Sequence, residues 1–253
     1  METVLWGVLP YLSLVVLIAG TIWRYRYDQF GWTTRSSQLY ESQLLRIASP
    51  LFHFGILGVL MGHIVGLLIP KSFTDWVGIS EELYHATALI VGGLAGLATL
   101  VGIVMLIYRR RTTGPVFMAT TTNDKVMYVF LAGAILAGMA ATFLSLVPSD
   151  EHHNYRETVS VWFRSLFILQ PDVAAMSAAT VAFKVHVVVA LLLFALWPFT
   201  RLVHAFTAPV HYLFRPYVVY RSRDDDRQPG QVSHKAWQPV GTPDRESRRK
   251  QRT

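Results

Sequence analysis

The fold of this chain is decided by Ser49–Pro70, which reads SPLFHFGILGVLMGHIVGLLIP. The stretch is apolar and long enough to cross the hydrocarbon core of a bilayer as a helix, which takes about 20 residues. It carries two histidines, His53 and His63. Ionisable side chains inside a membrane are costly and indicate a functional site. We therefore predict a membrane-spanning helix whose two histidines belong to a functional site.

A second apolar stretch carries histidines in the same way. Val181–His204 reads VAFKVHVVVALLLFALWPFTRLVH and contains His186 and His204. Two histidines on each of two spanning segments predict ligands for two stacked cofactors.

The whole chain has the composition of an integral membrane protein. Of its 253 residues, 52% are hydrophobic and only 15% are charged, which is unlike a soluble domain of this length. The apolar runs are continuous rather than alternating, so helices are favoured over the strands of a barrel. We predict an all-α domain over residues 1–220 with five spans, the first of them retained as a helix: Val4–Trp23, Leu51–Ile69, Leu83–Tyr108, Val126–Val147 and Ala178–Thr200.

The distribution of charge predicts how the spans are oriented. Lys and Arg concentrate in residues 24–50, 109–125 and after 200, whereas residues 70–82 and 148–177 carry more acidic than basic side chains. The positive-inside rule then places the N-terminus outside and the C-terminus in the cytoplasm of a prokaryotic cell. The net charge of +7 thus reports orientation in the cytoplasmic (inner) membrane, with no nucleic-acid surface.

Two segments outside the spans have their own predictions. Val159–Leu169 is apolar but too short to span, so we expect it to lie at the interface and roof a site at the outer face. Residues 221–253 are polar, basic and proline-containing. We expect this tail to be disordered unless a partner binds it.

The four histidines form a self-consistent set. In a continuous helix His186 and His204 face one way about 27 Å apart, whereas His53 and His63 are separated by about 15 Å. The second and fifth spans run antiparallel in a five-span topology. This pairs His53 with His204 near the cytoplasm and His63 with His186 near the outside, with a mean of roughly 21 Å between the two sites.

Facing imidazoles of this kind are suitable axial ligands for a haem iron. The chain has no cysteine, which excludes covalent haem attachment and iron–sulfur ligation, so the predicted cofactors are two b haems. Zinc is less favoured because third and fourth ligands are missing. The alternative is histidines that only pack or hydrogen-bond between helices. Arg110 and Arg201 lie near the inner face and are candidate partners of haem propionates, unless they are only positive-inside charges.

Several motifs resemble the gamma subunit of respiratory nitrate reductase, a membrane diheme cytochrome b. They read LFHFGILGVLMGH, FKVHVVVALLLFALWPFTRLVH, RYRYDQFGWTTRSSQ and ATTTNDK. The resemblance covers residues 8–220 and implies partnership with an iron–sulfur electron-transfer subunit and a molybdenum catalytic subunit. By position it implies that His63 and His186 bind the outer haem, and that His53 and His204 bind the inner one.

The resemblance also implies oxidation of menaquinol or ubiquinol beside the outer haem. Family members can carry a lysine at the outer start of the third span, where this chain reads Leu83-Tyr84-His85-Ala86. We hypothesise that His85 or Tyr84, with Gly62 nearby, contacts the quinone oxygen. His85 then accepts a quinol proton, since the ordinary pKa of histidine is about 6.5. The alternative is a pair of interfacial anchors.

These features predict a quinol-oxidising subunit that passes electrons through two b haems to a cytoplasmic nitrate reductase, in nitrate respiration or assimilation. Two alternatives remain. One is a diheme anchor of another respiratory reductase, such as a sulfite-reduction or heterodisulfide-type complex. The other is a membrane anchor or transporter without haem.

Overall fold

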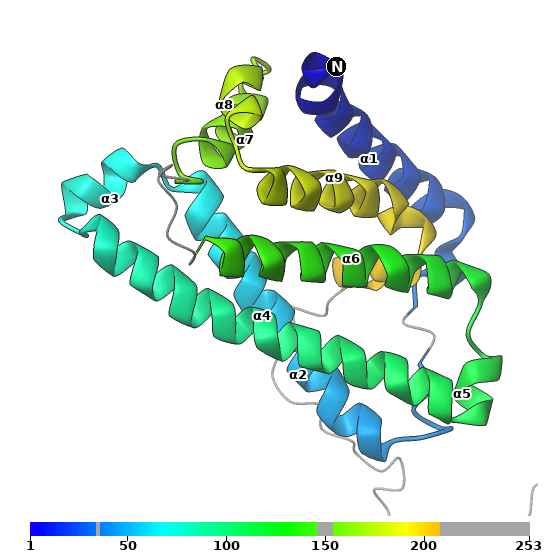
Figure 1. Cartoon of the computed structure of the whole chain (residues 1–253). Coiled ribbons are helices and arrows are strands. Elements are labelled where there is room, and N and C mark those ends of the chain that lie inside the picture. The colour runs from blue at the N-terminus through cyan, green and yellow to red at the C-terminus, as the bar shows by residue number, and fades with distance from the viewer. Residues whose placement is uncertain (34–35, 146–153, 208–253) are drawn as a thin grey trace, which may run out of the picture. The chain divides into compact units, whose positions relative to one another are not determined.

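The computed structural model describes residues 1–33, 36–145 and 154–207, all within a unit that spans Met1–Ala208. The predicted tail, residues 221–253, lies outside the described residues. The described ranges fold into helices and turns without a strand (Figure 1), in this order: η1 Thr3–Val8, α1 Leu9–Tyr27, η2 Gln29–Gly31, α2 Gln43–His63, η3 Ile64–Leu68, α3 Lys71–Val77, α4 Glu81–Thr112, α5 Gly114–Met118, α6 Thr122–Leu144, α7 Val159–Phe167, α8 Val173–Ser177, α9 Val181–Leu196, η4 Trp197–Phe199 and η5 Arg201–Thr207.

Five helical stretches are long and apolar enough to cross a membrane, as the composition predicts: Thr3–Tyr27, Gln43–Leu68, Glu81–Thr112, Thr122–Leu144 and Val181–Phe199. Two of them, α4 and α6, begin before the apolar run at polar residues that cap the helix. The hydroxyl of Ser80 accepts the amide of Leu83 at the start of α4, and Thr121 and Asp124 form a reciprocal capping box at the start of α6. These caps satisfy amides that a helix end leaves without partners.

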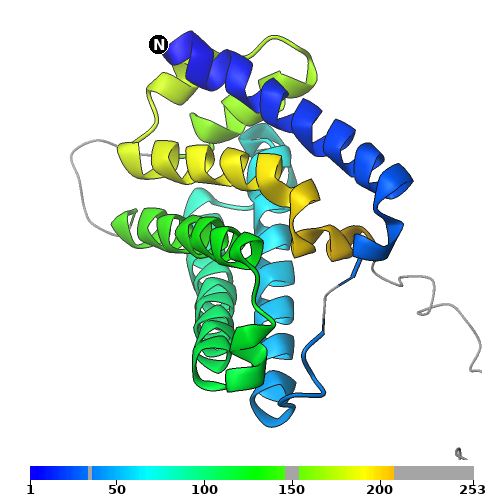
Figure 2. The same ribbon diagram turned by 90° about the vertical axis from the view of Figure 1, so that its right-hand side faces the viewer.

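Glycines allow α2 and α4 to pack with their backbones in contact. These helices form the most extensive pair, while α9 packs against both α6 and α1 (Figures 1 and 2). A Cβ atom on Gly102 meets the backbone nitrogen of Phe52 at 2.6 Å, and one on Gly55 meets that of Thr99 at 2.6 Å. Small residues at such crossings are typical of membrane helices.

Two apolar clusters hold the helices together. One joins α4, α6, α9 and η5 through Ile103, Met127, Leu131, Ala134, Leu193 and Leu202. The other lies where η1, α7 and α8 meet, and is built from Trp6, Val159, Trp162, Met176 and Ala179. In the second cluster the indole of Trp162 donates to the carbonyl of Trp6 at 2.8 Å. The predicted interfacial segment is thus a short helix, α7, packed on the start of the first span.

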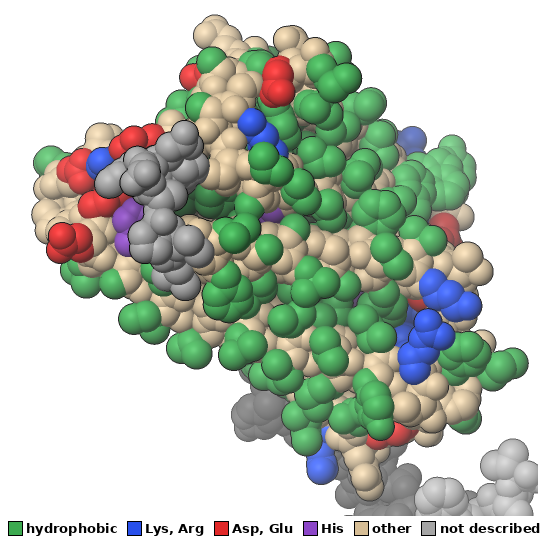
Figure 3. All heavy atoms as spheres, viewed as in Figure 1, with side chains coloured by type: hydrophobic (Ala, Val, Ile, Leu, Met, Phe, Trp, Pro, Cys, Tyr) green, Lys and Arg blue, Asp and Glu red, His purple; other side chains and the backbone are tan. Residues whose placement is uncertain are grey.

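Apolar side chains cover most of the face in Figure 3, with Lys and Arg gathered toward the end where α5 lies and Asp and Glu toward the end where α3 lies. Large exposed side chains such as Ile90, Val91 and Leu94 on α4 are at least 60% exposed. An exposed apolar surface of this kind is what a lipid-facing helix presents.

The fifth span is not one continuous α-helix, and Pro198 inside it indicates from the sequence where the interruption lies. Helix α9 ends at Leu196, and the chain continues through the 3₁₀ turns η4 and η5 around Pro198. A proline lacks an amide hydrogen and clashes with the preceding turn, so the α-helix stops there. His186 and His204 therefore lie on different segments, and the predicted 27 Å rise along one helix is wrong.

Candidate haem-binding sites

The structure brings the four histidines together in two pairs. The ring centroids of His53 and His204 are 6.1 Å apart, and those of His63 and His186 are 5.9 Å apart. Two imidazoles bound to opposite sides of one metal through bonds of about 2.0–2.1 Å place their centroids roughly 6 Å apart. These are the pairs that antiparallel spans predict, although His204 reaches its place from η5 rather than from α9.

Each imidazole leaves the same nitrogen available. The Nδ1 atoms of His53 and His63 lie 2.7 and 2.8 Å from the carbonyl oxygens one turn earlier on α2, those of Ser49 and Val59. A carbonyl only accepts, so Nδ1 of each neutral ring carries the proton and donates it. Nε2 then keeps its lone pair.

The partner histidines follow the same rule. Nδ1 of His186 donates to the carbonyl of Ala134 on α6 at 3.0 Å, and Nδ1 of His204 donates to that of Arg201 at 2.5 Å. Metal-bound histidines almost always donate their other ring N–H in this way, which fixes the tautomer and the ring plane. The donor set of each pair, two Nε2 atoms, fits a haem iron that takes its remaining ligands from the porphyrin.

Among the described residues, no group of three or more His, Cys, Asp or Glu side chains is placed to hold a metal ion. Such a group is what a structural zinc site needs.

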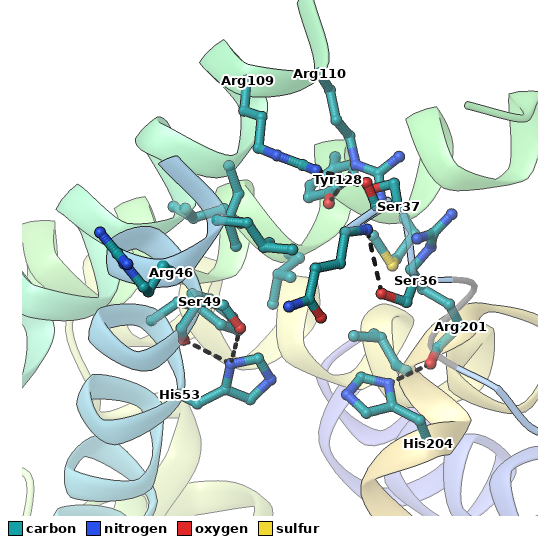
Figure 4. A pocket seen from close by; sticks show the side chains of 18 of the residues that line it. Ser36, Ser37, Arg46, Ser49, His53, Arg109, Arg110, Tyr128, Arg201 and His204 are labelled. Atoms are coloured by element: carbon teal, nitrogen blue, oxygen red, sulfur yellow. Dashed lines mark hydrogen bonds between the residues drawn. The ribbon is translucent and has the colours of Figure 1, made fainter. Parts of the chain in front are cut away.

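The inner pair, His53 and His204, faces a cavity of about 570 Å³ lined by α2, α4, α6, η5 and residues 36–43. The two imidazoles point toward one another from opposite sides of it (Figure 4). The volume lies within the roughly 300–1,000 Å³ of cofactor sites. Four arginines line the wall: Arg46, Arg109, Arg110 and Arg201.

The two arginines named from the sequence differ in their partners. Arg110 donates to the hydroxyls of Tyr128 at 2.9 Å and Thr120 at 3.1 Å, and so holds its charge at the cavity wall. Arg201 makes a two-point ion pair with Asp124, with Nε–Oδ1 and Nη2–Oδ2 distances of 2.7 and 2.5 Å. Asp124 therefore compensates the charge of Arg201, a partner that the sequence analysis did not identify.

Arg109 is a third cation that sequence reasoning missed. It is 2% exposed and donates to the hydroxyl and carbonyl of Ser37 and to the carboxylate of Glu41. Glu41 accepts the amide of Leu44, and this bond, with Arg109, holds the pKa of the carboxyl below its usual range. Arg109 thereby fastens residues 36–43, which line the cavity, to α4.

Near the outer pair, His63 and His186, the turn at residues 155–158 packs on α9 and on η3, which continues α2, and we call this turn the roof. Tyr155 contacts Phe183, with ring centroids 6.1 Å apart, and its hydroxyl lies 3.1 Å from the Cβ position of Gly66. Both neighbours are three residues from a histidine of the pair. Burial raises the pKa of the Tyr155 hydroxyl, so it stays protonated as a hydrogen-bond donor.

The residues predicted to contact quinol lie at the edge of this roof. The hydroxyl of Tyr84 is 3.1 Å from that of Tyr155, and the guanidinium of Arg156 lies 3.9 Å from the centroid of the Tyr84 ring. His85 is 41% exposed and pairs with Glu81 at 3.2 Å. Among the described residues, no atom outside the local turn lies within 4 Å of the Cβ position of Gly62, the residue before His63.

Some of these partners had a signal in the sequence and others had none. Thr121 and Asp124 have the spacing of a capping box, and Arg46 precedes His53 by two helical turns. Tyr155 follows a loop without periodicity, so nothing in the pattern marked it.

Comparisons with known proteins show which family the chain is similar to. The family model described as nitrate reductase gamma subunit matches residues 2–223. The nitrate reductase gamma chain of Bacillus subtilis is 44% identical over 87% of this chain and 98% of its own length. The respiratory nitrate reductase 2 gamma chain of Escherichia coli is 33% identical over 86% of this chain and 96% of its own.

A longer relative is also similar. The nitrate reductase-like protein NarX of Mycobacterium tuberculosis is 60% identical over 89% of this chain, which spans only 34% of that protein. The family match covers most of the chain, including both histidine pairs. The chain therefore belongs to the nitrate reductase gamma subunit family.

Proposed function

We propose that this chain is the quinol-oxidising cytochrome b subunit of a respiratory nitrate reductase in the cytoplasmic membrane. The observation that carries the proposal is the geometry of the two histidine pairs, each with its Nδ1 atoms bonded to backbone carbonyls and its ring centroids about 6 Å apart. His53 and His204 are the proposed axial ligands of an inner b haem, and His63 and His186 those of an outer one. When bound, each haem supplies a one-electron centre.

The chain's own residues give the two ends different tasks. At the outer end, Gly62 precedes His63, and a Cβ atom built on it meets no described atom of another segment within 4 Å. We assign this space to the quinol ring. The pair of His85 with Glu81 at 3.2 Å is the proposed acceptor of a quinol proton, because both side chains can bind a proton. Tyr84 and Tyr155 supply hydroxyls at the roof.

At the inner end, Arg110 and Arg46 are the proposed cations for the propionates of the inner haem. Both line the cavity that His53 and His204 face, and guanidinium groups bind carboxylates with two parallel hydrogen bonds. Arg201 lines the same wall but is paired with Asp124. The proposed electron acceptor is an iron–sulfur subunit on the cytoplasmic side, itself bound to the molybdenum subunit that reduces nitrate.

This direction of transfer has an energetic consequence. An electron carried inward moves against an outside-positive potential and costs about 2.3 kcal/mol per 100 mV. Protons released outside add to that potential. The difference between the quinol and nitrate potentials must supply the energy, so the proposed subunit contributes to energy conservation.

A redox titration of membranes that contain single histidine variants tests the proposal. We expect wild-type membranes to show two b-type centres per chain. His63→Ala and His186→Ala should each remove one and the same centre, and His53→Ala and His204→Ala the other. His85→Ala is the matched control, since it removes an imidazole at the membrane face and should keep both centres while slowing quinol oxidation. Loss of the same centre from His53→Ala and His186→Ala contradicts the assignment.

A further inference from the structure

The segment that carries His204 is held by side chains from two other helices. After α9 ends, the carbonyls of the broken turn lose the amide partners that a continuing helix supplies. Arg24 on α1 replaces those partners, because its Nη1 donates to the carbonyls of Pro198 at 2.6 Å and Thr200 at 2.8 Å. Arg24 is only 5% exposed, so this guanidinium is built into the packing.

Side chains of α6 bind Phe199 and Arg201, the two residues of this segment that Arg24 does not bind. The amide of Asn123 donates to the carbonyl of Phe199 at 2.5 Å, and Asp124 binds the guanidinium of Arg201 at two points. Asp124 is 4% exposed and also accepts the amide of Thr121 at 3.0 Å, which fixes its carboxylate. We call Arg24, Asn123 and Asp124 the 198–201 clamp, because together they bind each of the four consecutive residues from 198 to 201.

The clamp acts on the imidazole through Arg201. The carbonyl of Arg201 accepts the Nδ1 proton of His204 at 2.5 Å, and the side chain of the same arginine is held by Asp124. His186, by contrast, sits on a regular helix and donates to a carbonyl of α6. The position of His204 therefore depends on side chains from α1 and α6, because the 3₁₀ turns around it have poorer hydrogen-bond geometry than an α-helix.

We propose that Arg24, Asn123 and Asp124 are positioning residues of the inner site, which hold Nε2 of His204 opposite His53. The inference rests on the proposed function, because it assigns these residues to one of two haem sites. Their role is selective: they orient the inner ligand pair and leave the outer pair unaffected.

The experiment uses the full chain in membranes with its partner subunits. Arg24→Gln and Asp124→Asn are compared with wild type by haem content, by redox titration and by the low-spin EPR signal of each haem. Loss of a group that orients a metal ligand typically lowers metal affinity by about 10–100-fold. We expect inner-haem retention to fall by that factor, or the inner EPR signal to shift where the haem is kept, with the outer signal unchanged.

Two further variants separate positioning from folding. Arg156→Gln removes another buried arginine, which pairs with Glu81 at 3.2 Å near the start of α4, and it should leave the inner signal unchanged. Asn123→Ala removes one neutral bond of the clamp and serves if the charge variants fail to accumulate. A wild-type inner haem in all clamp variants overturns the inference, as does an equal loss of both haems in Asn123→Ala. The His204→Ala and His53→Ala results decide the proposed function separately.

Discussion

At the scale of single residues, each candidate site depends on which imidazole nitrogen is hydrogen-bonded to a backbone carbonyl and which is left to bind a metal. All four histidines donate the Nδ1 proton to a backbone carbonyl, so Nε2 is the candidate ligand atom in both pairs. For His53 and His63 the carbonyl belongs to the preceding turn of α2. For His186 it comes from Ala134 on α6, which makes the outer pair sensitive to the distance between α6 and α9.

Gly138 lets the ring of His186 approach α6, and its substitution gives the first prediction. A Cβ atom at this position meets Cε1 of His186 at 3.0 Å and Nδ1 at 3.3 Å, so Gly138→Ala must displace the ring. Crowding of this kind costs about 1–3 kcal/mol, and we expect the outer haem to be retained roughly 5–150-fold more weakly. Difference spectra of the two haems measure this loss. Gly133→Ala on the same helix meets only Val189 at 3.6 Å and should behave as wild type.

At the scale of elements, the packing of α2 on α4 holds the helix that carries His53. Gly102→Ala places a Cβ atom 2.6 Å from the backbone nitrogen of Phe52, which cannot yield as a flexible side chain does. We expect the helices to separate, with a loss of about 1–3 kcal/mol and a lower content of the inner haem. Thermal unfolding in detergent and inner-haem content report the two effects. Gly92→Ala is the control, because among the described residues no atom outside the local turn of α4 lies within 4 Å of its Cβ position. Equal behaviour of the two variants contradicts this reasoning.

The segment of residues 36–43 that lines the inner cavity gives a prediction on pH. Because the folded-state pKa of Glu41 is lowered, its contribution to holding residues 36–43 is present above the unfolded value of about 4.3. That contribution is lost as the pH falls through the folded value. We expect hydrogen exchange in this segment, corrected for the intrinsic rate, to accelerate below about pH 4. Glu41→Gln should exchange faster at neutral pH and lose this acid step. An acid step that persists in Glu41→Gln assigns it to another group.

At the scale of the whole molecule, hydropathy predicts the helices, and the number of spans between the second and the fifth predicts the histidine pairs. Five apolar runs give five helices long enough to span, and antiparallel second and fifth spans suffice to bring His53 to His204 and His63 to His186. Periodicity carries no information about the break before His204. Pro198 marks its place, but the bond that stabilises it comes from Arg24, 174 residues away in the chain.

Roles of polar residues were harder to predict for the same reason. Arg201 has the charge and position of a propionate partner, yet Asp124, 77 residues away, pairs with it. Tyr155 belongs to the roof near the outer pair and follows a loop whose pattern predicts nothing about contacts. Long-range pairing of this kind depends on how the helices pack, which local sequence does not specify.

The orientation of the helices across the membrane can be tested by a direct measurement. The proposed function needs α3 and the start of α4 outside and α5 in the cytoplasm, as the excess of Lys and Arg in residues 109–125 predicts. The chain has no cysteine, so Ser72→Cys in α3 and Thr112→Cys at the end of α4 each introduce a single thiol. In intact cells, a membrane-impermeant maleimide should label Ser72→Cys alone, and permeabilised cells should show both labelled. Labelling of Thr112→Cys in intact cells places the His63–His186 pair toward the cytoplasm, and quinol oxidation there releases no protons outside.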